Sequence, residues 1–185
     1  RVEYALKIIE SDNKRTENLV KREIDILKTI NHKNIIETHN VIYSSENNII
    51  IIMFEYCLMG DLHKLMKSSG KISEKIAIRY IFQIIEGLKY LNDNNIIHRD
   101  LKPQNILIDC DNNIKICDFG FSRKFGNSEL LDTMCGSPLY MAPEIIRHKS
   151  YNNKSDMWSF GIIVYQLLTG ELPYKAGTIY ELFTF

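Results

Sequence analysis

The sequence lacks a net charge, long apolar runs and a secretory signal pattern, and each absence argues against a class of protein. Its 185 residues include 23 Lys plus Arg and 23 Asp plus Glu, so the formal net charge is +0. This balance gives no electrostatic reason to expect nucleic acid or an anionic membrane as a partner. The apolar runs, such as residues 49–54, are far too short to span a bilayer. We therefore expect a cytoplasmic protein without a transmembrane segment.

Cysteine is scarce and is not arranged for metal binding. The four cysteines, Cys57, Cys110, Cys117 and Cys135, show no C-x-x-C spacing, which argues against zinc ligands. We interpret them as reduced core or loop thiols of a cytosolic protein. The contents of apolar residues (45%) and charged residues (25%) are ordinary for a soluble globular protein. The length allows a sizeable core in one or two domains.

What the sequence does contain is a crowded polar loop at residues 97–105, between a long amphipathic helix and a short apolar strand. Its His, Arg, Asp, Lys and Asn side chains are poor core material, but they make sense if they converge on a reacting phosphate. Asp100 can take or orient the proton of an attacking hydroxyl, and Lys102 can hold the charge on the transferring group. Asn105 can ligate a metal ion. The alternative is a chance polar loop before a strand.

The string His98-Arg99-Asp100-Leu101-Lys102-Pro103-Gln104-Asn105 resembles the catalytic loop H-R-D-L-x-x-x-N of protein kinases. The match is unbroken, and a Lys after Asp-Leu is the serine/threonine-kinase form of the motif. Downstream, Asp118-Phe119-Gly120 follows a predicted β-hairpin and resembles the kinase D-F-G motif. The resemblance implies that Asn105 and Asp118 hold Mg²⁺. It also implies that Gly120 lets the chain turn and that Phe119 is a plug whose packing separates active from inactive forms.

A lysine and a glutamate upstream of the loop extend the resemblance. Tyr4-Ala5-Leu6-Lys7 resembles the kinase strand motif V-A-I-K, which implies that Lys7 pairs the α- and β-phosphates of ATP and that Ala5 packs on the adenine. Glu23 borders the apolar stripe of a predicted helix. It is either a solvent-facing acid or the helix glutamate that clamps Lys7, and the surrounding residues favour the clamp. Breaking the Lys7–Glu23 pair would then be an on/off switch.

Residues 54–61 resemble the hinge between the kinase lobes, where the adenine binds. The resemblance implies a gatekeeper at the back of the pocket, two hinge residues whose backbones bond the adenine edge, an acid that reaches the ribose, and a further ATP-binding leucine. Phe54 would be the gatekeeper, and the backbones of Glu55 and Cys57 would bond the adenine edge. Asp61 would reach the ribose, and Leu107 would be the further ATP-binding leucine.

Residues 135–144 resemble the kinase segment that receives peptide substrates and ends in A-P-E at Glu144. The resemblance implies that Thr133, just before it, is an activating phosphosite whose phosphate Arg99 reads. The alternative is that Thr133 is an ordinary loop hydroxyl. Ser137 stands where the family usually has a Thr that bonds the catalytic Asp and Lys, which is a conservative change for a hydroxyl.

The predicted elements follow the order of a kinase domain. Period and turn signals predict strands over 2–9, 35–43 and 48–54, helices over 17–30, 74–91 and 155–168, and a hairpin of 106–108 with 114–117. The strand over 48–54 is apolar throughout, so we expect it to be buried on both faces. The long helix is predicted to start at a Ser73 cap and to bury a stripe of isoleucines and leucines.

Two further positions carry specific expectations. Asp156, at the start of the helix over 155–168, matches the buried aspartate that braces the catalytic-loop backbone in this family. Thr38 departs from the family, which usually has a Leu there as part of a hydrophobic spine. Either the strand register is off by one residue or the spine is weakened at this point.

The resemblance implies an α+β, bilobal protein-kinase fold in truncated form. Residues 1–56 would be a partial, β-rich N-lobe and residues 57–185 a partial, mainly helical C-lobe. No G-x-G-x-x-G motif occurs, the first residues match the third family strand, and the last residues fall before the final family helices. We therefore interpret the sequence as a fragment of a kinase catalytic domain.

The implied function is a serine/threonine protein kinase that uses ATP and Mg²⁺ on protein substrates. Its activation would come from another kinase or from trans-autophosphorylation at Thr133. Residues 134–144 and 164–170 look most like the autophagy-initiating ULK kinases, although calcium/calmodulin-regulated and aurora-like kinases share much of the pattern. A non-catalytic kinase-fold scaffold is one alternative, motivated by the missing glycine motif. A small-molecule phosphotransferase is another, and the peptide-binding segment counts against it.

Overall fold

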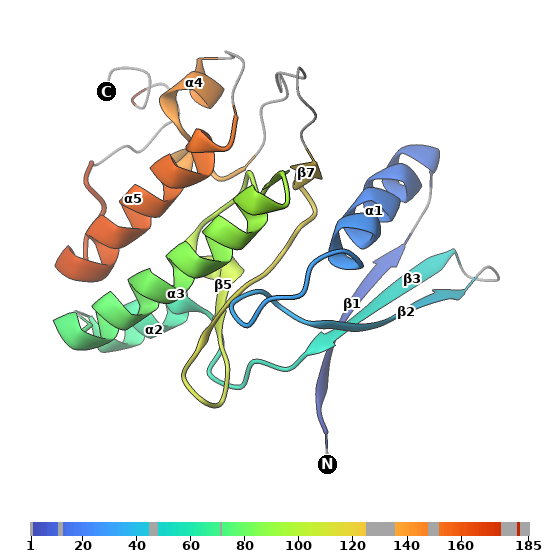
Figure 1. Ribbon diagram of the computed structural model, residues 1–185, viewed down its shortest axis with the longest axis horizontal. Helices are drawn as coiled ribbons and strands as arrows, with labels where there is room; N and C mark the ends of the chain where they lie inside the picture. Colours follow the sequence, from blue (N-terminus) through green and yellow to red (C-terminus); the bar gives the residue numbers. More distant parts are fainter. Residues whose placement is uncertain are drawn as a thin grey trace.

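The computed structural model describes residues 2–10, 13–44, 48–70, 72–124, 136–147, 152–174 and 181. A three-stranded sheet with one helix beside it forms one part of the described chain, and helices with two short strand pairs form the other (Figure 1). No helix in the described ranges is long and apolar enough to cross a membrane.

The sheet consists of β1 (Tyr4–Glu10), β2 (Thr38–Ser44) and β3 (Ile49–Glu55), in the antiparallel order β1-β3-β2. The expectation that the last strand is buried on both faces is wrong. Ile50 and Ile52 are buried, whereas Ile51 between them is only half-buried. Ile51 lies opposite Ile8 of β1, which is 62% exposed, so this face of the sheet is open. An apolar run cannot by itself reveal which of its two faces a fold covers.

Helix α1 (Lys14–Leu27) begins earlier than predicted because Asn13 caps it, with Asn13 Oδ1 accepting the Thr16 N–H at 3.0 Å. Its stripe of Val20, Ile24 and Leu27 is buried, as predicted. Ile30 lies beyond the end of the helix and is half-buried.

The segment that follows α1 ties the two parts of the chain together. The strand predicted over 35–43 begins only at Thr38, because residues 34–36 bond elsewhere. The Ile36 N–H donates to the Ile116 carbonyl and the Ile116 N–H to the Asn34 carbonyl, both at 2.9 Å. This pairing spans about eighty positions of sequence, so no local pattern predicts it.

The helical part contains α2 (Leu62–Ser69), the long α3 (Glu74–Asp93), α4 (Pro143–Ile146) and α5 (Lys154–Thr169). Figure 1 shows α3 and α5 running side by side. The short strands pair as β5 (Ile106–Ile108) with β6 (Ile114–Ile116), and β4 (Ile96–Ile97) with β7 (Arg123–Lys124). The β5–β6 hairpin is the one predicted, one residue shorter.

Two details of α3 differ from the prediction. Ser73 occupies the N-cap position, but its side chain makes no capping hydrogen bond among the described residues. In the predicted apolar stripe, Ile84, Leu88 and Leu91 are buried, whereas Ile85 is 39% exposed. The buried face of α3 also includes Ala77, Tyr80 and Gly87. The prediction missed these three residues because it considered isoleucines and leucines alone.

Candidate active site

The polar loop at 97–105 is held by a buried carboxylate on α5. Asp156 Oδ2 accepts the His98 N–H at 2.7 Å, and Asp156 Oδ1 accepts the Arg99 N–H at 2.9 Å. These bonds confirm the predicted bracing role of Asp156. Arg99 has a φ of 73°, a left-handed conformation that non-glycine residues adopt at a cost when surrounding contacts hold them there. The loop is therefore fixed in a strained conformation.

Asp100, Lys102 and Ser137 form a closed set of hydrogen bonds. Lys102 Nζ lies 2.8 Å from both Asp100 Oδ2 and Ser137 Oγ, and Ser137 Oγ donates to Asp100 Oδ1 at 3.0 Å. The serine thus makes the contacts that the resemblance implies for a threonine hydroxyl. Asn105 Nδ2 donates to the Asp100 backbone carbonyl at 2.9 Å and to Asp100 Oδ2 at 3.1 Å. Asp100 is 4% exposed, and the bonds that Lys102, Asn105 and Ser137 make to its Oδ atoms orient its carboxylate.

Gly136 makes room for the loop. Its φ is 104°, and a Cβ added there would lie 2.6 Å from the Arg99 carbonyl oxygen and 3.5 Å from Asp100 Oδ1. Only a residue without a side chain allows the backbone to pass this close. Gly136 therefore sets the distance between Ser137 and Asp100.

Lys7, Glu23 and Asp118 form a second charged cluster. Lys7 Nζ lies 2.6 Å from Glu23 Oε1 and 3.4 Å from Asp118 Oδ1. Burial acts to lower the pKa of Lys7, but the two carboxylates outweigh it and raise that pKa, so the ammonium form is stabilised. Glu23 is 5% exposed. The structure therefore favours the ion pair over the alternative of a solvent-facing glutamate.

Phe119 and Gly120 lie where Asp118 turns toward Lys7. Phe119 is 1% exposed, and its ring packs edge-on against His98 with 5.2 Å between the ring centroids. Asp118 has a φ of 64°, which is a second left-handed non-glycine residue at the site. A Cβ on Gly120 would lie 3.4 Å from Asp118 Oδ1. The buried plug and the tight turn place the Asp118 carboxylate beside the lysine.

A pocket of about 400 Å³ opens between the sheet and the loop, and most predicted ATP-binding residues line it. They are Ala5, Lys7, Glu23, Phe54, Glu55, Cys57, Leu107 and Asp118. Asp61 is not among the residues that line it. Its Oδ1 accepts the Lys64 N–H at 2.8 Å and caps α2, so its contact with a ribose stays a prediction.

The pocket also includes residues that the sequence did not point to. Ile36 and Cys117 line it. Cys117 alternates with buried Ile116 at the end of β6, so a period-two count would have placed it on the pocket side. Ile36 reaches the pocket only through its long-range pairing with Ile116. Burial raises the pKa of both Cys57 and Cys117 to about 12.

Asp118 and Asn105 are the two side chains of this site that suit Mg²⁺. The Asp118 side chain is 42% exposed, and Asn105 uses its amide nitrogen toward Asp100, which leaves a carbonyl oxygen as a ligand. Protein sites for Mg²⁺ often supply only one or two such oxygens and leave the others to phosphates and water. The donor set fits a magnesium nucleotide.

Three residues carry predictions about activation and substrate binding. Thr133 lies outside the described residues. Glu144 is half-buried in the first turn of α4. Arg99 is 6% exposed and lies on the loop held by Asp156. The roles of these three residues stay predictions.

The order of the elements and the contacts of the loop define a protein-kinase fold of the α+β class. A family model described as Protein kinase domain matches residues 1–183, and the chain belongs to this family. Its relatives include Serine/threonine-protein kinase atg1 of Dictyostelium discoideum, 41% identical over 97% of the chain and 28% of the relative. Serine/threonine-protein kinase ATG1b of Arabidopsis thaliana is 44% identical over 92% of the chain and 24% of the relative.

A third relative, Probable serine/threonine-protein kinase MARK-B of Dictyostelium discoideum, is 41% identical over 93% of the chain and 24% of its own length. The chain therefore spans about a quarter of the length of these relatives. The presence of ATG1 kinases among these relatives agrees with the predicted resemblance to the autophagy-initiating ULK kinases.

Replacing Gly136 with Ala tests the close approach at the loop. We expect Gly136→Ala to lower the free energy of unfolding by about 1–3 kcal/mol, because the new Cβ meets the Arg99 carbonyl at a strained φ. Gly161→Ala on α5 is the matched control, since a Cβ there meets nothing within 4 Å and helical alanine is neutral or stabilising by up to about 1 kcal/mol. Urea denaturation measures both. Equal stability of the two variants would show that the approach is not tight.

The thiols of the pocket should be unreactive. We expect iodoacetamide at pH 8 to leave Cys57 and Cys117 unmodified, because a pKa of about 12 keeps all but about one thiol in ten thousand protonated. Exposed Cys110 should be alkylated under the same conditions. Peptide mass spectrometry over a time course measures all three. Alkylation of Cys117 as fast as Cys110 would contradict the burial.

Proposed function

We propose that the chain is catalytic-domain sequence of a serine/threonine protein kinase, with a partial N-lobe at 1–56 and a partial C-lobe at 57–185. The observation that carries this proposal is the bonded set of Asp100, Lys102 and Ser137. A scaffold needs no such set. In a kinase, it places a carboxylate and an ammonium group where a hydroxyl attacks a phosphate.

The proposed roles follow from the contacts. Asp100 accepts or orients the proton of the substrate hydroxyl, and its carboxylate is aimed by Asn105 and Ser137. Lys102 holds charge on the transferring group. Lys7, fixed by Glu23, holds the nucleotide phosphates. When bound, ATP supplies the phosphoryl group and Mg²⁺ neutralises the developing charge. The chain's own contribution is positioning and charge stabilisation.

The pocket of about 400 Å³ supports ATP as the nucleotide. Phe54 lines this pocket and is proposed to be the gatekeeper at its back, and the backbones of Glu55 and Cys57 are proposed to bond the adenine edge. Asp61 is proposed to reach the ribose. Asn105 and Asp118 are the proposed magnesium ligands.

Regulation and cellular setting extend the proposal. Phosphorylation of Thr133, by another kinase or by a second copy, would give Arg99 a phosphate to bind. The ATG1 relatives support a role in signalling of the autophagy-initiating type, with protein substrates in the cytoplasm. A non-catalytic scaffold remains the rival outcome of the test that follows.

The test is transfer of the γ-phosphate from Mg·ATP by the natural full-length protein to Ser, Thr and Tyr peptides. We expect transfer to Ser and Thr peptides, and we expect Asp100→Asn to lower kcat by at least about 100-fold, since it removes the base. Asp93→Asn, an exposed aspartate at the end of α3, is the matched control and should retain full activity.

A nucleotide-binding assay separates the rival functions. Asp100→Asn should still bind ATP, because the pocket does not include its side chain. Binding of ATP by the wild-type protein without any transfer, in protein phosphorylated at Thr133, would favour the scaffold.

A further inference from the structure

The outer edge of β6 is bonded to groups that lie outside its hairpin. On its inner edge β6 pairs with β5. On its outer edge, the Ile114 N–H donates to Gln83 Oε1 at 2.7 Å, and Asn34 Nδ2 donates to the Ile114 carbonyl at 3.1 Å. The next bonds along this edge join Ile116 to the backbone of residues 34–36. Two side-chain amides thus continue a backbone ladder along the strand.

Gln83 joins the start of β6 to the long helix α3. Its Oε1 accepts the Ile114 N–H, and its Nε2 donates to Asn113 Oδ1 at 3.1 Å. Both ends of one amide are therefore used on two successive residues of the hairpin. Ile114 is buried, and a buried N–H that loses its acceptor is costly. Gln83 therefore fixes where β6 begins relative to α3.

Two further side chains of α3 hold the turn between β5 and β6. Arg79 Nη2 donates to Asn113 Oδ1 at 3.0 Å. The Tyr80 hydroxyl donates to Asn112 Oδ1. A hairpin of two short strands is marginally stable by itself, so these bonds from the helix decide where the turn lies.

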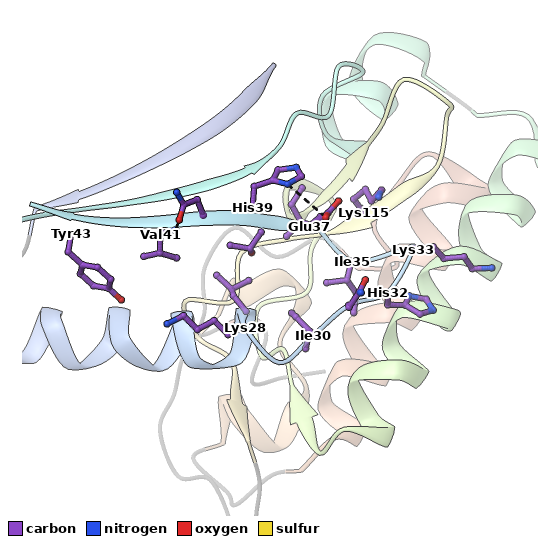
Figure 2. Close-up of a pocket in the computed structure, with 15 residues that line it drawn as sticks. Lys28, Ile30, His32, Lys33, Ile35, Glu37, His39, Val41, Tyr43 and Lys115 are labelled. Atoms are coloured by element: carbon purple, nitrogen blue, oxygen red, sulfur yellow. Dashed lines mark hydrogen bonds and ion pairs between the residues drawn. The ribbon is translucent and has the colours of Figure 1, made fainter. Parts of the chain in front are cut away.

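The helix also holds the segment that pairs with the far end of β6. The Asn31 N–H donates to the Tyr90 hydroxyl at 2.9 Å, and the His32 ring stacks on the Tyr90 ring with 5.0 Å between centroids. Figure 2 shows His32 of this segment beside α3. A Cβ added to Gly87 of α3 would lie 2.8 Å from Ile116 Cδ1. The whole outer edge of β6 is therefore positioned by α3, directly or through this segment.

The end of β6 is held by the polar loop at 97–105. The Cys117 N–H donates to the Asn105 carbonyl at 2.9 Å, and His98 Nε2 lies 2.9 Å from the Cys117 carbonyl oxygen. Asp118 is the next residue and has a φ of 64°. The strand is thus fixed by α3 at its start and by the loop at its end, and Asp118 lies directly beyond the second anchor.

The other strand of the hairpin has anchors of its own. The Met59 N–H donates to the Ile108 carbonyl at 3.1 Å, and the Ile108 N–H donates to the Gly60 carbonyl at 2.9 Å. These bonds hold β5 and its Leu107, which lines the pocket proposed for the nucleotide. Loss of a bond from α3 should therefore affect the β6 side of that pocket more than the β5 side.

We propose that Gln83 is a positioning residue for magnesium binding, which acts on Asp118 through β6. This role rests on the proposed function, because it takes Asp118 as a magnesium ligand. Gln83 is not among the residues that line the pocket, so it touches neither the nucleotide nor the metal ion. By fixing the start of β6, it sets where the strand presents the Asp118 carboxylate to a magnesium nucleotide.

The test titrates Mg²⁺ into the natural full-length protein with N-methylanthraniloyl-ATP and follows nucleotide fluorescence, so it needs no phosphate transfer. Gln83→Met keeps the length of the side chain but offers no donor and only a weak acceptor. We expect it to raise the Mg²⁺ concentration for half-maximal binding by at least about threefold. This is less than the loss of about 10- to 100-fold typical of residues that contact a metal ligand directly.

Adenosine binding separates a positioning role from a merely structural one. Adenosine needs no Mg²⁺, and its proposed contacts are with the hinge and β5. We expect Gln83→Met to change its affinity by less than about twofold, because the two sites share no partner. Lys89→Met, at an exposed position of the same helix, is the matched control and should bind Mg²⁺ nucleotide and adenosine like the wild type.

A conservative variant tests the bond itself. Gln83→Glu retains an oxygen that accepts the Ile114 N–H, so we expect it to restore most of the wild-type Mg²⁺ response. Thermal melts check that each variant is folded. If Gln83→Met does not fold, Gln83→Asn takes its place, because its shorter side chain keeps the amide but does not reach Ile114.

The outcomes separate this role from the proposed function. A folded Gln83→Met protein with the wild-type Mg²⁺ response would overturn the role of Gln83, as would equal weakening of adenosine and Mg²⁺ nucleotide. Gln83→Glu that behaves like Gln83→Met would also overturn it. Wild-type protein that binds Mg·ATP without transferring phosphate would overturn the proposed catalysis alone. Wild-type protein whose nucleotide binding does not respond to Mg²⁺ would overturn both.

Discussion

The site depends on one buried interaction, in which the Asp156 carboxylate accepts hydrogen bonds from two backbone N–H groups. Both carboxylate oxygens are used, one for His98 at 2.7 Å and one for Arg99 at 2.9 Å. Burial raises the pKa of Asp156, and the His98 and Arg99 groups oppose that rise. The result is a loop whose strained residue cannot relax without leaving a buried acceptor unpaired. Because Asp100 directly follows Arg99 in the chain, its backbone is held in place as well.

The second half of the site comes from a different part of the chain. Lys7 lies on β1 and Glu23 on α1, so their 2.6 Å ion pair depends on where that helix lies. The pairing of residues 34–36 with Ile116 joins this half to the strand that leads to Asp118. The pocket proposed for the nucleotide lies between these two halves, which explains why side chains from both line it.

Sequence motifs predicted most of the contacts within the site. Asp100, Lys102 and Asn105 lie within six positions, so their proximity needs no tertiary knowledge, and the resemblance supplied their partner Ser137. The Lys7–Glu23 pair also follows from motifs, and the structure favours it over the solvent-facing alternative.

The structural predictions that were wrong or missing concern features that depend on long-range packing. Periodicity could not show that one face of β3 is open, nor that residues 34–36 leave the sheet to pair with β6. The same limit hid Ile36 in the pocket. Thr38 is at the first position of β2, followed by a register shift before Asn40. A strand pattern could not predict that register shift, nor that the Thr38 hydroxyl makes no hydrogen bond within the described part of the chain.

The most direct measurement is the phosphate transfer rate of Asp156→Asn in the natural full-length protein. An amide of the same shape has one oxygen acceptor, so one of the two loop N–H groups would face an NH₂ group and the loop would shift. The account predicts a loss of kcat of at least about 100-fold with ATP affinity retained, because Asp156 lies outside the nucleotide pocket. A folded Asp156→Asn protein with wild-type kcat would contradict it.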